Sequence, residues 1–370
     1  MNLAQKIIIT LVISTIAVAC GHKKQTETPE ESIILNEETV SAFALKIENA
    51  VLNDNPVMLN QAFDEVAIRD SISSNSIVLS SLDTDFGKTF WRENFKIGNY
   101  CVTMVNQGGD FKFTRYYEKD GEHHIVFRTY CDYGLRIDDY VVHVADSVLK
   151  IKEGFIYNLS STLTHQIEYD MLYRIMQRTD PEGITSHLTQ AADLLDRDES
   201  KQAFRLLNEH RAMLKEYPYF WQLYIRALFE TVPGKFIEGL EQLADEGFDE
   251  RAILTHKLLY FANQGDVKAT EEVITKLIDY TGDDPIYLLF YGRSNYMAGY
   301  YKDALTCYEN AAQNLPLIWD IWYGLLECYA ELNDKAKFDQ TVALAESNFG
   351  MTQDEIKELI EKDFLPKMTR

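Results

Sequence analysis

The sequence lacks the short motifs that mark common active sites and nucleotide sites. Its 370 residues contain no phosphate-binding loop of the form G-x-x-x-x-G-K-[ST], and no G-x-G-x-x-G, G-x-S-x-G, H-E-x-x-H or C-x-x-C. Their absence disfavours an enzyme without excluding one. We therefore predict no catalytic residue, no metal site and no cofactor.

A dense run of lysine and arginine is also absent. The 36 basic residues stand against 58 acidic ones, which gives a formal net charge of −22. Such a surplus of negative charge repels the phosphates of nucleic acids and anionic lipid head groups. We therefore predict no nucleic-acid partner, and we interpret the charge mainly as a source of solubility.

The apolar run near the start is too short for a membrane-spanning helix, which needs ~20 residues. It follows Lys6, extends from Ile7 to Ala19, and is interrupted by Thr10, Ser14 and Thr15. A charged start, an apolar middle and small residues at the end are typical of a secretory signal.

The end of this run, Ala17-Val18-Ala19-Cys20-Gly21, resembles the lipobox of bacterial lipoproteins. In that family the cysteine thiol is joined to diacylglycerol and the chain is cut just before it. The resemblance implies a signal peptide over 1–19, lipidation at Cys20 and a disordered tether over 20–36. The protein would then be anchored in the bacterial cell envelope, facing the periplasm or the cell surface. Ala17 stands where the family usually has leucine, and a plain secretory signal with an incidental cysteine is the alternative.

Few other cysteines are present: Cys101, Cys131, Cys307 and Cys328. An envelope location permits disulfides, but a chain of this length can bury a core without them. We expect all four to be buried free thiols.

The second half of the chain, 184–370, has apolar residues at spacings of three and four, with glycine and proline at segment ends. The segment from Pro285 to Pro316 predicts two short helices joined at Gly299. It resembles a tetratricopeptide repeat, a helix–turn–helix unit of 34 residues. The positions that carry the resemblance are Gly292, Ala304, Tyr308, Ala311 and Pro316. The final segment, Gln353 to Lys362, suits a terminal cap.

This resemblance implies a solenoid whose first helices line a concave groove that holds a peptide or a protein segment. Carried over by position, the groove residues are Trp221, Asn263, Arg293, Tyr296, Tyr323 and Glu327. The alternative is that these side chains are exposed without a ligand, or that they pack against the protein's own amino-terminal domain.

The region between the tether and the repeats, 37–180, predicts an α+β domain. Helices are expected over Asn36–Ser71 with a break at Asn53–Pro56, and a further helix over Ser160–Arg178. Asp120-Gly121 is the strongest hairpin turn. The expected strands are Tyr100–Asn106, Phe111–Glu118, His123–Cys131, Leu135–Val144 and Val148–Tyr157.

Helices followed by a meander of long strands resemble the nuclear transport factor 2-like (cystatin-like cone) fold over 37–160, a superfamily that often leaves a pocket. A generic α+β domain is the main alternative. Within the sheet, Arg128, Asp139 and His143 are candidates for a ligand pocket. Asp139 and His143 share a strand face but are ~13 Å apart, too far for a direct dyad.

The predicted architecture is therefore an α+β amino-terminal domain, with helices and a curved antiparallel sheet, followed by an all-α helical solenoid of the tetratricopeptide type. The predicted function is binding of a protein or peptide partner in the groove, as a scaffold or assembly factor anchored to the membrane at Cys20. The alternative function is a small-molecule-binding or enzymatic α+β domain that the repeats support.

Overall fold

The computed structural model describes residues 33–72, 76–131, 134–180, 182–352 and 354–356. The predicted signal peptide, Cys20, nearly all of the predicted tether and most of the predicted cap lie outside this range. The described residues from Leu35 onward form one compact unit. No helix in the described ranges is long and apolar enough to cross a membrane, and Cys101, Cys131, Cys307 and Cys328 are free thiols.

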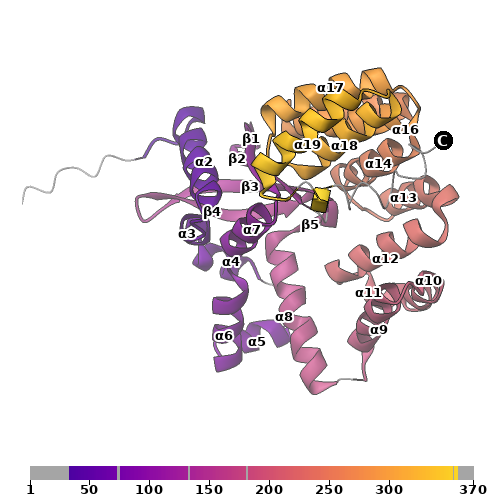
Figure 1. The fold of residues 1–370 in the computed structure, drawn as a ribbon. Helices are drawn as coiled ribbons and strands as arrows, with labels where there is room; N and C mark the ends of the chain where they lie inside the picture. The colour runs from indigo at the N-terminus through magenta and orange to yellow at the C-terminus, as the bar shows by residue number, and fades with distance from the viewer. Residues whose placement is uncertain (1–32, 73–75, 132–133, 181, 353, 357–370) are drawn as a thin grey trace, which may run out of the picture. The chain divides into compact units, whose positions relative to one another are not determined.

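A group of helices precedes the sheet (Figure 1). The first begins at a capping box in which Asn36 and Thr39 each bond the other's backbone N–H. The chain then breaks at Asn53–Pro56, as predicted. The helices are α2 (Glu37–Leu52), α3 (Val57–Ala62), α4 (Glu65–Ser71), α5 (Ser76–Leu82), α6 (Asp85–Asn94) and α7 (Ile97–Asn106).

The strand predicted over Tyr100–Asn106 is wrong, because these residues belong to α7. The segment is short and rich in apolar and β-branched residues, so its sequence fits a strand or a buried helix equally well. The buried residues of α7 include Gly98, Cys101 and Val102, a spacing that places them on one side of a helix. Packing against α3 and the sheet therefore decides the structure.

The described residues form a five-stranded antiparallel sheet in the order β1-β2-β3-β4-β5. Asp120 and Gly121 connect β1 to β2, and both have positive φ, as a two-residue hairpin turn requires. The four long strands agree with the predicted ones to within about two residues. The strands are β1 (Asp110–Lys119), β2 (Glu122–Cys131), β3 (Gly134–Ala145), β4 (Val148–Ile156) and β5 (Ser161–Thr162).

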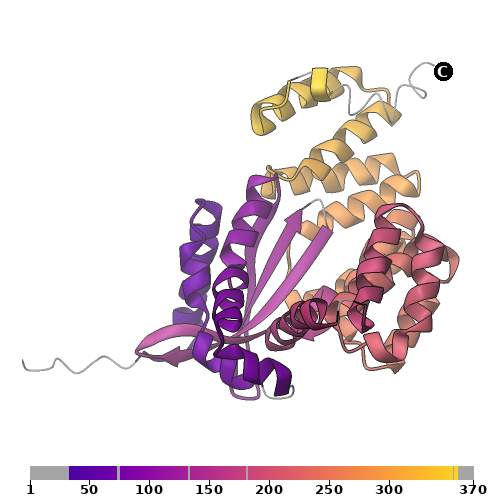
Figure 2. The same cartoon turned by 90° about the horizontal axis from the view of Figure 1, so that it is seen from below.

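Helices lie on both faces of the sheet (Figures 1 and 2). Alternate residues of a strand point to opposite faces. Ile125 and Phe127 belong to the core formed with the amino-terminal helices, of which α2 and α7 contact β1 and β2. Val126 and Tyr130 belong instead to the core formed with the carboxy-terminal helices.

Helices follow the sheet to the end of the described chain, and consecutive helices pack in pairs, including α9 with α10, α14 with α15, α16 with α17 and α18 with α19. The elements are η1 (Tyr157–Leu159), α8 (Leu163–Thr179), α9 (Ile184–Asp196), α10 (Ser200–Glu209), α11 (Arg211–Leu214), α12 (Pro218–Thr231), η2 (Pro233–Lys235), α13 (Phe236–Asp245), α14 (Glu250–Gln264), α15 (Val267–Thr281), α16 (Ile286–Met297), α17 (Tyr301–Asn314), α18 (Trp319–Glu331) and α19 (Lys335–Phe349).

Close helix packing surrounds Tyr308 of α17. A Cβ atom at Gly292 would lie 2.6 Å from its ring, and one at Gly324 would lie 2.4 Å from it. Both glycines are therefore needed where α16 and α18 meet α17. Ala304, predicted at a small position of this helix pair, and Ala311, predicted to fill the contact between the helices, are fully buried.

Candidate binding groove between the sheet and the helices

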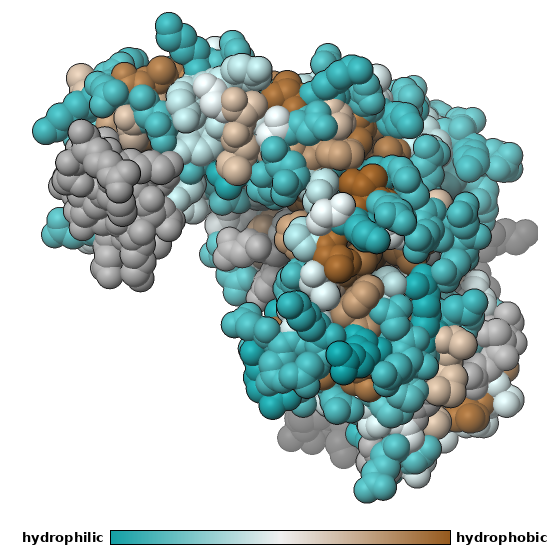
Figure 3. Space-filling model, turned by 90° about the vertical axis from the view of Figure 1, so that its right-hand side faces the viewer, coloured by the Kyte–Doolittle hydropathy of each residue, from teal (hydrophilic) through white to brown (hydrophobic). Residues whose placement is uncertain are grey.

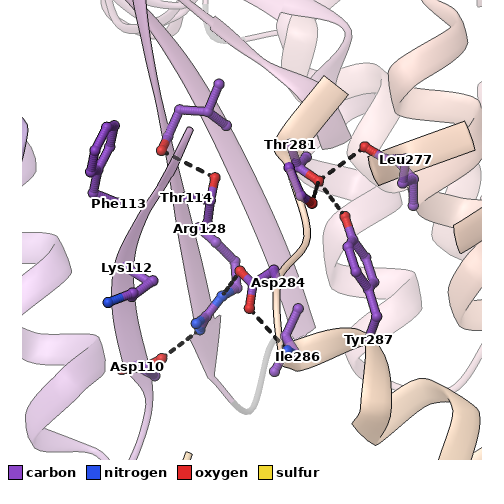
Figure 4. Close-up of polar contacts among 12 residues, drawn as sticks. Asp110, Lys112, Phe113, Thr114, Arg128, Leu277, Thr281, Asp284, Ile286 and Tyr287 are labelled. Carbon is purple, nitrogen blue, oxygen red and sulfur yellow. Dashed lines mark hydrogen bonds and ion pairs between the residues drawn. The ribbon is translucent and has the colours of Figure 1, made fainter. Parts of the chain in front are cut away.

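The sheet is joined to the carboxy-terminal helices by a buried ion cluster around Arg128 (Figure 4). Its side chain on β2 is 2% exposed. Arg128 donates from one nitrogen to Asp284 before α16 at 2.8 Å, and from another to Asp110 on β1 at 2.6 Å. Asp284 also accepts a hydrogen bond from the backbone N–H of Ile286, the first residue of α16.

A second cluster surrounds Asp139, which is also buried. One carboxylate oxygen lies 3.0 Å from Nδ1 of His124, and the other accepts from the Tyr117 hydroxyl and, at 3.2 Å, from Arg251 of α14. The Arg251 guanidinium lies 3.9 Å from the ring centroid of Phe155. Burial, followed by the charge of Asp139, raises the pKa of Tyr117, so its hydroxyl remains a donor at neutral pH.

The third candidate of the predicted sheet pocket, His143, lies elsewhere. Its Nε2 is 2.9 Å from a carboxylate oxygen of Asp64, which caps α4. No hydrogen bond or ion pair joins any two of Arg128, Asp139 and His143 in the described part of the chain. Arg128 and Asp139 instead attach the sheet to the helices.

Four of the predicted groove residues line one cavity of about 280 Å³: Asn263, Arg293, Tyr323 and Glu327. They come from α14, α16 and α18. Arg293 donates to Glu327 at 3.2 Å and to Asn263 at 3.3 Å, which fixes the guanidinium across the three helices. Tyr130 of β2 also lines this cavity and donates to Asp320.

The other two predicted groove residues lie in packed aromatic surroundings. Tyr296 is 8% exposed. Its ring centroid lies 5.9 Å from the Arg293 guanidinium and 5.4 Å from the ring centroid of Tyr301. Burial, and then the negative charge of Glu327, raises the pKa of Tyr296. Trp221 of α12 packs against Phe220, Tyr224 and Phe248, with the Arg211 guanidinium 5.6 Å from its ring centroid.

A larger cavity of about 730 Å³ lies between the sheet, α12 and α14. Leu259 and Asn263 of α14 line both cavities, so the two adjoin along α14, and we call them together the inner groove. Aromatic and aliphatic side chains make up most of its lining, and Phe229 is 41% exposed. On the face shown in Figure 3, hydrophobic residues gather in the middle with hydrophilic ones around them. The larger cavity is lined by Tyr100, Thr129, Cys131, Gly134, Leu135, Arg136, Asn158, Leu159, Gln222, Ile225, Arg226, Phe229, Phe236, His256, Leu259, Tyr260 and Asn263.

Sequence reasoning missed most residues of the larger cavity. Tyr100 was expected on a strand, and Arg136 and His256 carry no motif. His256 Nε2 lies 3.2 Å from the Asn158 carbonyl, and burial lowers the pKa of the imidazole to about 4. The ring is therefore neutral at pH 7 and donates to that carbonyl.

Comparison with protein-family models, with curated proteins and with solved structures gives no match. The chemistry of the groove must therefore be inferred from its own residues. Among the described residues, no group of three or more His, Cys, Asp or Glu side chains is placed to hold a metal ion. Amides and fixed guanidinium groups are instead suited to form hydrogen bonds with the backbone of an extended peptide. Aromatic faces are suited to pack against its side chains.

Proposed function

We propose that this chain is a lipid-anchored protein of the bacterial envelope that binds an extended segment of a partner protein in the inner groove, as a scaffold or assembly factor. One observation carries the proposal. Four of the six side chains predicted from repeat position, Asn263, Arg293, Tyr323 and Glu327, line one cavity, and a larger cavity adjoins it along α14.

The helix pairing around Tyr308 supports the assignment of the second half to the tetratricopeptide type. Repeats of this type need small residues where neighbouring helices approach, and Gly292, Gly324 and Ala304 supply them. Under this assignment α12, α14, α16 and α18 are first helices, which in that family face the ligand.

The sheet occupies part of the inner face of these helices, through Arg128 with Asp284 and Tyr130 with Asp320. A partner segment would therefore contact helices on one side and the sheet on the other. Two rigid walls reduce the ordering cost of binding, because the receptor side chains are already held in place.

Attachment to the membrane would follow from lipidation at Cys20, as the lipobox resemblance implies. A small-molecule ligand is the second candidate function. It is favoured by the size of the larger cavity, about 730 Å³, which lies within the ~300–1,000 Å³ of small-molecule sites.

The test is a crosslinked pull-down from native membranes with the full chain. The variant Asn263→Ala/Tyr323→Ala removes two groove side chains and leaves the ion pair of Arg293 with Glu327 intact. Tyr300→Ala is the control, because Tyr300 is 58% exposed and outside both cavities.

A stoichiometric protein captured by the native chain and by the control, and lost from the groove variant, is the expected result. Equal capture by all three would remove the groove from the interaction. Preparations that capture no protein but release a small molecule on denaturation would favour the second function.

A further inference from the structure

A separate cavity of about 310 Å³ lies between α8 and the start of α12, and half of its eight lining residues are tyrosines. Sequence reasoning singled out none of its residues. The lining is Gln166, Tyr169, Asp170 and Tyr173 of α8, with Tyr217, Pro218, Tyr219 and Gln222 around the amino end of α12. We call it the tyrosine cavity.

The four rings form two edge-to-face pairs. Tyr169 and Tyr217 have ring centroids 5.1 Å apart at 85°, and Tyr173 and Tyr219 have centroids 6.2 Å apart at 65°. The two rings of each pair therefore present faces that are steeply inclined to each other. The hydroxyl of Tyr173 is fixed by Thr189 at 2.8 Å and Gln177 at 2.7 Å.

Besides the tyrosine hydroxyls, the polar side-chain groups of the tyrosine cavity are two amides and one carboxylate. Asp170 is paired with Arg174 at 3.3 Å, so its charge is balanced locally. The Nε2 atom of Gln166 is buried and has no hydrogen-bond partner among the described residues. A buried amide donor without a partner costs free energy, which a ligand with an acceptor would recover when the Gln166 side chain turns toward the cavity.

We propose that the tyrosine cavity binds a carbohydrate of one or two neutral pyranose rings. A pyranose has an apolar C–H face, which would stack on the tyrosines, and hydroxyl groups that both donate and accept. Those hydroxyls suit the amides of Gln166 and Gln222 and the carboxylate of Asp170. The cavity volume is at the lower end of the ~300–1,000 Å³ of small-molecule sites.

Two other ligand classes fit less well. A quaternary ammonium ion is recognised by aromatic cages, but it has no acceptor for the Gln166 amide, and Arg174 stands beside Asp170. A purely apolar ligand would likewise leave the amides unpaired.

Gln222 lines both the tyrosine cavity and the larger cavity of the inner groove. The carbohydrate site does not depend on the function proposed for the groove. If both are occupied, their ligands meet at this side chain.

The experiment uses the full chain and three neutral disaccharides, cellobiose, chitobiose and maltose. Binding is measured by saturation-transfer NMR and by titration. We expect saturation of the ring C–H protons of at least one sugar. Tyr219→Ala should weaken binding about 3- to 10-fold, the value of one aromatic contact. The sugar affinity of Tyr219→Phe should stay within about twofold of that of the native chain, and the affinity of Tyr300→Ala should equal it.

Gln166→Leu gives a second readout that does not depend on removing a ring. A similar-sized apolar side chain removes the unpaired amide, so folding stability should be kept or raised while sugar affinity falls. No saturation transfer to any of the three sugars would overturn the proposal. So would affinity unchanged by both Tyr219→Ala and Gln166→Leu, or binding of tetramethylammonium or a proline-rich peptide in place of the sugars.

Discussion

Arg128 and Asp284 are 156 positions apart in the sequence, and their side chains form a buried ion pair at 2.8 Å. One belongs to the sheet and the other lies just before α16, so the pair joins the two halves of the described chain directly. Asp110 on the neighbouring strand completes the cluster at 2.6 Å (Figure 4). Buried charged groups therefore lie between the sheet and the carboxy-terminal helices and bond the two together.

The first prediction concerns this cluster. Arg128→Ala should lower the free energy of unfolding by about 3–5 kcal/mol, because two carboxylates would remain buried without their cation. Urea unfolding of both proteins measures the difference. The matched control is Arg69→Ala, since Arg69 pairs with Asp83 at the surface. Its cost should not exceed about 1 kcal/mol. Equal costs for the two variants would contradict the cluster's role.

The second prediction concerns the contact of Gly324 with Tyr308. Gly324→Ala should destabilise the chain by about 1–3 kcal/mol, because the new methyl group would overlap the ring. In a Tyr308→Leu background the same change should cost less, since the ring is gone and alanine favours a helix over glycine. A double-mutant cycle in thermal unfolding measures the coupling. Additive effects would show that the ring and Gly324 do not meet.

The third prediction concerns pH. His256 has a pKa of about 4 in the folded chain because burial disfavours the charged ring. The unfolded chain binds the proton near pH 6.5. Below that value the unfolded state holds more protons, so stability should fall as the pH drops from about 6.5 to 4, by about 1–3 kcal/mol.

Comparison with His256→Gln isolates this contribution from other titrating groups. Glutamine keeps an N–H donor for the Asn158 carbonyl, which His256 reaches at 3.2 Å, and it does not titrate. The difference in unfolding free energy between the two chains should change between pH 7 and pH 4.5. A constant difference would show that His256 takes up no proton on unfolding.

The fourth prediction concerns the anchor. Cys20→Ala should abolish labelling with a radioactive fatty acid and release or misprocess the protein, because position 20 would no longer carry a thiol to accept diacylglycerol. Membrane fractionation with and without the substitution measures this. Full membrane retention of a correctly processed Cys20→Ala chain would refute lipidation at this position.

Local features of the fold could be predicted from the sequence where short-range chemistry decides them. Asp120-Gly121 specifies its own hairpin turn, and Asn53 to Pro56 interrupts a helical pattern. The segment Tyr100–Asn106 could not be assigned, because its apolar residues satisfy strand and helix alike and only neighbours at α3 and β2 distinguish them.

The contacts between distant segments were beyond sequence reasoning. The docking of β2 on α16 depends on Arg128 and Asp284, and no local pattern links those two positions. Tyr296 illustrates the same limit, since repeat position places it toward the groove while its surroundings leave it 8% exposed. The tyrosine cavity combines residues of α8 and α12, which the predicted domain boundary separates.

The inner groove has one wall from the sheet and one from the helices, with Leu259 and Asn263 shared between its two parts. An occupant that contacts both walls stabilises the association of the two halves of the chain. By mass action, a ligand at 100 times its dissociation constant adds about 2.7 kcal/mol to the stability of the folded state. A rise in the melting temperature of this protein that is absent from Asn263→Ala/Tyr323→Ala, followed across the fractions of a crude extract, would therefore report the groove's occupant whatever its chemical class.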